Sequence, residues 1–129
     1  MDKNKVVVEE AGPGPFVQTV KVRDHNVLAD EPLTFPEGTD KGFSPNDFLL
    51  SALGTCTSIT VRMYARLKKI PLDKTVVKLE RLASGEIVRE IEFKGNLSSE
   101  QKDKLFQIAN KCPIHKALTD KLTIASKII

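Results

Sequence analysis

Short runs of alternating apolar and polar residues fill the first third of the chain. "KVVVEE" (5–10) and "FVQTVKV" (16–22) are rich in β-branched residues and are joined by the turn-forming "AGPGP". "HNVLADEP" (25–32) is a third such run and ends at a proline, after which Pro, Gly and Asp dominate residues 33–43. The pattern predicts three strands followed by a loop.

A long helix is predicted next. Ser44 suits an N-cap, Pro45 the first helical position and Asp47 the third, which is the arrangement of a capping box. Apolar and small residues then recur at three- and four-residue spacing as far as Pro71, so we expect the helix to end near Lys69. The stripe that this spacing predicts to be buried consists of Leu49, Leu53, Cys56, Thr60, Met63 and Leu67.

The second half of the chain predicts a hairpin and then helices. "KTVVKLERLA" (74–83) and "EIVREIEFKG" (86–95) are two strand-like runs separated by "SG". "SSEQKDKLFQIANKC" (98–112) is amphipathic and begins with serines that suit an N-cap, and Pro113 ends it.

The last residues complete the order of elements. "PIHKALTD" (113–120) is expected to form a turn or short helix, and "LTIASKII" (122–129) a closing strand. The order β-β-β-α-β-β-α-α-β is typical of an α+β fold. Without a repeat or a linker, we expect a single domain over residues 1–129.

Composition and charge narrow the classes of function. Hydrophobic residues make up 40% of the chain and charged residues 29%, with a net charge of only +3 and interspersed signs, so we expect no nucleic-acid partner. No apolar run approaches the ~20 residues of a membrane span, and the N-terminus lacks an apolar signal core, so we expect no membrane partner. We therefore expect a cytoplasmic protein, where cysteines are more often thiols, metal ligands or redox pairs than static disulfides.

The chain has two cysteines, in very different settings. Cys56 lies on the apolar stripe, where a free cysteine commonly packs as a small hydrophobe, and that structural role stays open. Gly54 costs ~1 kcal/mol relative to alanine inside a helix, which indicates a close approach by another element. Cys112 precedes Pro113 at the expected start of a helix, a position that lowers a thiol pKa, although it could equally be the buried end of the preceding helix.

Other kinds of site receive little support. Two histidines, His25 and His115, could join the cysteines as metal ligands, but the spacing is neither CxxC nor HxxxH, so we expect no metal and no cofactor. The GxSxG motif of many serine hydrolases is absent from the sequence.

The segments around the cysteines resemble a known family. "GFSPNDFLLSALGTCTSITVRMYA" (42–65) followed by "NKCPIHKAL" (110–118) is similar to the OsmC/Ohr family of osmotically inducible and organic-hydroperoxide-resistance proteins. "ADEP" (29–32) and "GTDKG" (38–42) resemble the loop before the long helix in an OsmC-like branch. The specific feature is a Pro-x10-Cys pattern, from Pro45 to Cys56, combined with a later Cys-Pro.

The resemblance implies a fold and an activity. The fold would be OsmC-like, with β-sheets wrapped around long central helices in an intertwined homodimer. The activity would be reduction of organic hydroperoxides, with Cys56 as the peroxidatic thiol, Cys112 as the resolving thiol and a dithiol as the reductant. Arg23 is the position that matches the arginine stabilising the thiolate in the family. This chemistry suits the residues, because a thiolate attacks the O–O bond and the sulfenic acid condenses with a second thiol.

One position departs from the peroxidase branch, which has a glutamate directly after the helix-starting proline. This chain has Asn46 there, which can hydrogen-bond an arginine but supplies no charge. Two functions therefore stay open: a thiol-dependent peroxidase, and a non-enzymatic redox-sensing or small-ligand-binding dimer of the same family.

Overall fold

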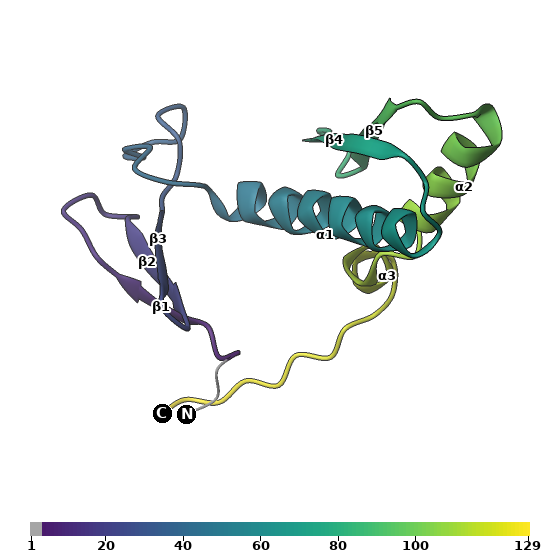
Figure 1. The fold of residues 1–129 in the computed structure, drawn as a ribbon. Helices are drawn as coiled ribbons and strands as arrows, with labels where there is room; N and C mark the ends of the chain where they lie inside the picture. Colours follow the sequence, from purple (N-terminus) through teal and green to yellow (C-terminus); the bar gives the residue numbers. More distant parts are fainter. Residues whose placement is uncertain (1–3) are drawn as a thin grey trace. The chain divides into compact units, whose positions relative to one another are not determined.

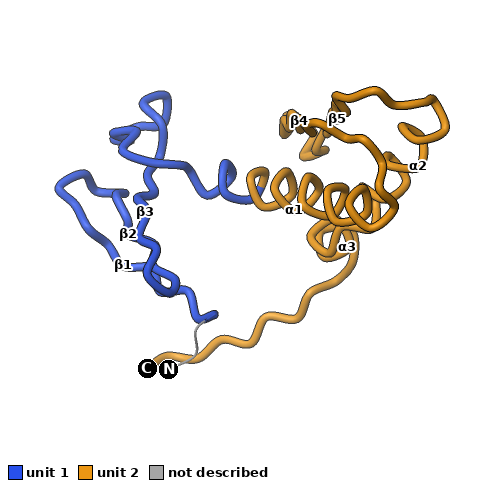
Figure 2. The backbone as a smooth tube through the Cα atoms, viewed as in Figure 1, with its two compact units in different colours: residues 1–49 blue, residues 50–129 orange. Residues whose placement is uncertain are grey.

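The computed structural model describes residues 4–129 and has α+β architecture (Figure 1). The chain forms two compact units, the first ending at Leu49 and the second beginning at Leu50 (Figure 2). The expectation of a single domain stays a prediction. In chain order the elements are β1 (Val7–Glu10), β2 (Gln18–Val22), β3 (His25–Ala29), α1 (Pro45–Leu67), β4 (Leu72–Arg81), β5 (Ile87–Gly95), α2 (Ser99–Ala109) and α3 (Pro113–Thr119).

The first unit contains the three predicted strands as an antiparallel sheet in the order β1-β2-β3. The loop after β3 is held by Asp30, whose buried carboxylate accepts hydrogen bonds from the backbone N–H groups of Glu31, Thr39 and Lys41 and from the Thr39 hydroxyl. These bonds give a polar loop a defined path up to the start of α1.

The start of α1 is the predicted capping box. The Ser44 hydroxyl accepts from the Asp47 N–H at 3.2 Å, and the Asp47 carboxylate accepts from the Ser44 N–H at 2.9 Å. These reciprocal bonds satisfy two donors that have no partner within the helix. The helix ends at Leu67, two residues before the predicted end.

The prediction of the buried stripe on α1 was partly wrong. The buried positions are Leu53, Gly54, Thr57, Val61 and Ala65, whereas Met63 is 66% and Leu67 75% exposed. The reason is that small side chains let the hairpin and α2 come close, and the Thr57 hydroxyl can be buried because it donates to the Leu53 carbonyl at 2.6 Å. The close approach expected at Gly54 is confirmed, since a Cβ there would lie 2.8 Å from Cδ1 of Leu79 on β4.

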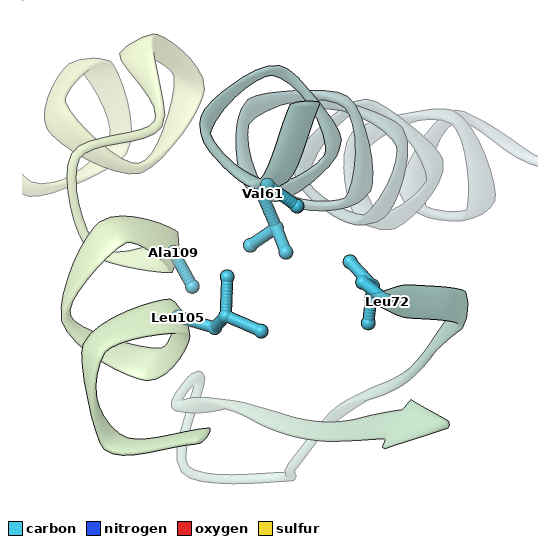
Figure 3. Packing of buried hydrophobic residues seen from close by; sticks show 5 residues of the cluster. Val61, Leu72, Leu105 and Ala109 are labelled. Atoms are coloured by element: carbon cyan, nitrogen blue, oxygen red, sulfur yellow. The ribbon is translucent and has the colours of Figure 1, made fainter. Parts of the chain in front are cut away.

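The second unit has its core between α1, the hairpin and α2. β4 and β5 pair antiparallel as predicted, and Ser98 caps α2 with a capping box to Gln101. Val61, Leu72, Leu105 and Ala109 point toward one another and form the centre of this core (Figure 3). Val61 and Leu105 are completely buried, so α2 is fixed against the C-terminal half of α1.

The predicted closing strand at 122–129 does not form. A strand needs a hydrogen-bonded neighbour, and no strand of residues 4–129 pairs with this segment. Its apolar side chains are exposed, with Ile124 at 85%. Among the helices of the described chain, none is long and apolar enough to cross a membrane.

Candidate functional site

The second unit contains both cysteines. Cys56 lies in the middle of α1. The predicted stripe placed it among the buried residues, but its side chain is partly exposed. Cys112 is the N-cap of α3, as its position before Pro113 predicted, and it is completely buried. Ala109, at the end of α2, belongs to the packed core and is followed by the short segment that leads to Cys112. The core that holds α2 against α1 therefore also determines the position of Cys112.

The two thiols lie close enough for each to influence the pKa of the other. Burial is the largest influence on Cys56 and would raise the pKa of its thiol. Hydrogen bonds from the Cys112 thiol, the Ile114 N–H and the Thr60 hydroxyl outweigh it, and the pKa of Cys56 falls below its ordinary value. Each of these donors stabilises a thiolate on Cys56, which is the nucleophilic form of the residue.

Cys112 has the opposite tendency. Burial raises the pKa of the Cys112 thiol above its ordinary value, and its hydrogen bond to Cys56 raises it further, although the N–H groups of His115 and Ile114 act in the other direction. The expectation that the helix start lowers the pKa of the Cys112 thiol was wrong, because the effect of a helix start is small compared with complete burial. Cys112 is therefore the proton donor of the pair and Cys56 the acceptor.

Arg89 on β5 connects the segments that carry the cysteines. Its Nη1 donates to the Thr57 hydroxyl at 3.0 Å, and its Nη2 donates to the Asn110 side-chain oxygen at 2.6 Å. Burial lowers the pKa of the Arg89 guanidinium, and negative charge on Cys112 raises it. Our sequence analysis missed Arg89, because one arginine in an alternating strand looks like an ordinary exposed residue.

Two other arginines, Arg23 and Arg62, lie elsewhere in the fold. Arg23 lies in the turn between β2 and β3, in the first unit, and contacts the Asn4 side chain at 3.5 Å. The structure therefore does not test its match to the thiolate-stabilising arginine. Arg62 on α1 donates to the carbonyls of Leu72 and Asp73, at 2.7 and 3.3 Å, and so ties the start of β4 to the helix.

Arg89 also lines a cavity of about 380 Å³. His115 also lines it, and the other lining residues are mainly apolar: Leu53, Gly85, Ile87, Phe106, Leu118 and Thr119. His25 lies on β3 in the first unit, whereas His115 belongs to the second unit. Within residues 4–129, no group of three or more histidine, cysteine, aspartate or glutamate residues could hold a metal ion.

Comparison with known proteins identifies the family. The model of the OsmC-like protein family matches residues 38–127, which include both cysteines. The chain belongs to the OsmC-like family. A search of curated proteins gave no significant match to the sequence.

Solved structures with the OsmC fold are similar over most of the chain. A Psychrobacter arcticus protein named for osmotic stress and detoxification has 22% identity and a TM-score of 0.74, with 91% of this chain and 88% of that chain covered. An OsmC-like protein of Mycoplasma pneumoniae has 24% identity and a TM-score of 0.71, covering 92% and 89%. The organic hydroperoxide resistance protein OhrB of Bacillus subtilis has 20% identity and a TM-score of 0.55, covering 88% and 89%. At these identities the similarity shows a shared fold.

The hydrogen bond between the thiols of this OsmC-like protein gives a first prediction. Replacing Cys112 with alanine removes a donor to the Cys56 thiolate, so the pKa of Cys56 should rise and its alkylation should require a higher pH. Cys112→Ser keeps a donor of similar size and is the matched control. The measurement is the rate of iodoacetamide alkylation against pH by mass spectrometry. Identical profiles for Cys112→Ala and wild type would contradict the assignment.

Proposed function

We propose that this OsmC-like protein is a thiol-dependent peroxidase that reduces organic hydroperoxides, with Cys56 as the attacking thiol and Cys112 as the resolving thiol. The observation that carries the proposal is the proximity of the two thiols, which influence each other's pKa, with Cys56 as the partly exposed member whose pKa is lowered. A peroxide can reach a partly exposed sulfur, and a completely buried sulfur beside it is positioned for the second step.

The proposed reaction has two steps on these residues. The Cys56 thiolate attacks the O–O bond, one oxygen is transferred to sulfur, and the alkoxide leaves and takes a proton from solvent to become an alcohol. The Cys56 sulfenic acid then reacts with Cys112: the S–S bond forms, the S–O bond breaks, and the hydroxide with the proton of Cys112 leaves as water. An external dithiol restores both thiols and is itself oxidised to a disulfide.

The family supports a peroxide-related role. The OhrB protein of Bacillus subtilis, which has the same fold, is named for organic hydroperoxide resistance. The apolar side chains around the Arg89 cavity, among them Leu53, Phe106 and Leu118, suit an organic hydroperoxide better than hydrogen peroxide.

Oxidation of intact protein tests the two roles. One equivalent of cumene hydroperoxide should remove two hydrogens' mass from wild type and leave a disulfide within one chain. Cys112→Ser should instead gain one oxygen at Cys56, and Cys56→Ser should stay unmodified on the same timescale, because each variant lacks one step. The measurement is intact mass and peptide mapping after quenched reaction times. Equally fast reaction of Cys56→Ser and wild type would reverse the roles.

A second candidate is a non-enzymatic redox-sensing or small-ligand-binding dimer. The observation that favours it is Asn46, which puts a neutral side chain where the peroxidase branch has a glutamate. Turnover of cumene hydroperoxide with a dithiol reductant separates the two functions. A peroxidase consumes many equivalents of hydroperoxide, whereas a sensor is oxidised once.

Arg23 is proposed to stabilise the Cys56 thiolate, as its match to the family arginine implies. Arg23→Ala should then move the alkylation profile of Cys56 to higher pH, because loss of a cation raises a thiol pKa. Lys21→Ala, at the exposed position of β2, is a control that removes one positive charge from the same sheet. Equal profiles for both variants would show that Arg23 has another role.

The active form is proposed to be a homodimer. Ile59, Met63 and Leu67 form an exposed apolar stripe on α1, and a further exposed apolar segment lies at 122–129. A second copy of the chain could cover both surfaces, and the segment could then gain the strand neighbour that it lacks.

Light scattering tests the dimer and the role of the C-terminal segment. Wild type should have twice the 14.3 kDa chain mass at low micromolar concentration. In a paired strand, Ile124 and Ala125 would face opposite sides, so Ile124→Lys and Ala125→Lys should differ in their effect on the dimer. A folded wild-type monomer would contradict the proposal, and equal masses for the two variants would exclude strand pairing.

A further inference from the structure

Arg89 links the two segments that carry the thiols, and neither step of the proposed reaction involves it. Its guanidinium donates to Thr57, which directly follows Cys56, and to Asn110, which precedes Cys112 by two residues. The side chain comes from β5, so it joins a third element to the two segments that carry the thiols. These bonds, of 3.0 and 2.6 Å, fix the direction of the guanidinium.

Among residues 4–129, no carboxylate forms an ion pair with the Arg89 guanidinium, although this group is partly buried. Negative charge on Cys112 raises the pKa of the Arg89 guanidinium, so the thiolate and the guanidinium attract each other. Because attraction between two charges is mutual, the cation that gains from this thiolate also stabilises it.

Cys112 needs such a cation at one stage only. In the reduced protein, Cys112 can keep its proton and donate it in the hydrogen bond to Cys56. Once Cys56 is oxidised, Cys112 must lose that proton and attack from a completely buried position, where burial opposes the charge. The groups that face it are Cys56 from α1, Arg89 from β5 and the N–H groups of Ile114 and His115 from its own segment.

We propose that Arg89 is a positioning residue for the resolving step, in which it stabilises the Cys112 thiolate as this thiolate attacks the oxidised Cys56. The inference rests on the proposed roles of the two cysteines and adds a residue from β5 to them. It assigns Arg89 to formation of the disulfide and not to the first attack on the peroxide.

The test uses an aromatic disulfide, dithiobisnitrobenzoate, so that it does not depend on peroxidase activity. Cys56 first attacks the reagent, forms a mixed disulfide and releases one coloured thiolate. The Cys112 thiolate then attacks the Cys56 sulfur, the S–S bond between the cysteines forms, and the second coloured thiolate leaves. The proton of Cys112 goes to solvent. The second colour change therefore measures closure, with Cys112 as the nucleophile.

Closure is measured against pH for wild type, Arg89→Gln and Arg89→Lys. Loss of the charge should shift the profile of Arg89→Gln to higher pH and slow closure about three- to tenfold near neutrality, since fewer thiolates form but each is more nucleophilic. At high pH, where Cys112 is ionised in both proteins, Arg89→Gln should close at least as fast as wild type. Arg89→Lys should recover part of the shift because it keeps the charge. Arg66→Gln, which removes an exposed charge at the last turn of α1, is the matched control.

The outcomes separate the possible roles of Arg89. An equal slowing of Arg89→Gln at every pH would show a structural role only, and an unchanged profile would show none; either result overturns the inference. Arg89→Met, which keeps the apolar length of the side chain, takes the place of Arg89→Gln if that variant does not fold. A wild type that closes normally with the aromatic disulfide but fails to reduce cumene hydroperoxide would refute the peroxidase and leave this test valid.

Discussion

The packing of α1 against α2 is the contact on which the candidate site depends. Val61 and Leu105 are completely buried where the two helices meet. Val61 lies five residues after Cys56 in the sequence, and Leu105 lies seven residues before Cys112. The small residues on the buried face of α1 allow this approach, and the Arg89 bonds hold the same segments from the hairpin side. Loss of this packing would separate the two thiols without changing either of them.

Burial and hydrogen bonding shift the pKa values of two chemically identical residues in opposite directions. Burial acts to raise the pKa of both thiols. At Cys56, hydrogen bonds to the sulfur outweigh burial and the pKa is lowered, whereas at Cys112 the interaction with Cys56 adds to the effect of burial and the pKa is raised. The partly exposed sulfur is thereby the easier one to ionise. Complete burial keeps the Cys112 sulfur away from solvent. In the proposed reaction, this difference makes Cys56 the first thiol to react and Cys112 the second.

Local signals in the sequence predicted most of the elements. Ser44 and Asp47 predicted the start of α1, and Pro113 predicted the break before α3, because caps and prolines act within a few residues. The Pro-x10-Cys pattern of the resemblance led to the correct family. The misses concern contacts between distant segments: neither the partnership of Arg89 with Thr57 and Asn110 nor the unpaired state of 122–129 leaves a periodic signal in the chain.

An equilibrium redox titration of wild-type protein tests the central claim most directly. The protein is incubated in buffers with different ratios of reduced to oxidised dithiothreitol, quenched with acid, and mapped by mass spectrometry. Because the two thiols lie close enough to influence each other's pKa, closure within the chain should be strongly favoured over any mixed product. We expect one two-electron transition that converts Cys56 and Cys112 into their shared disulfide. Two thiols that stay reduced across the series, or that form disulfides only between chains, would contradict the account.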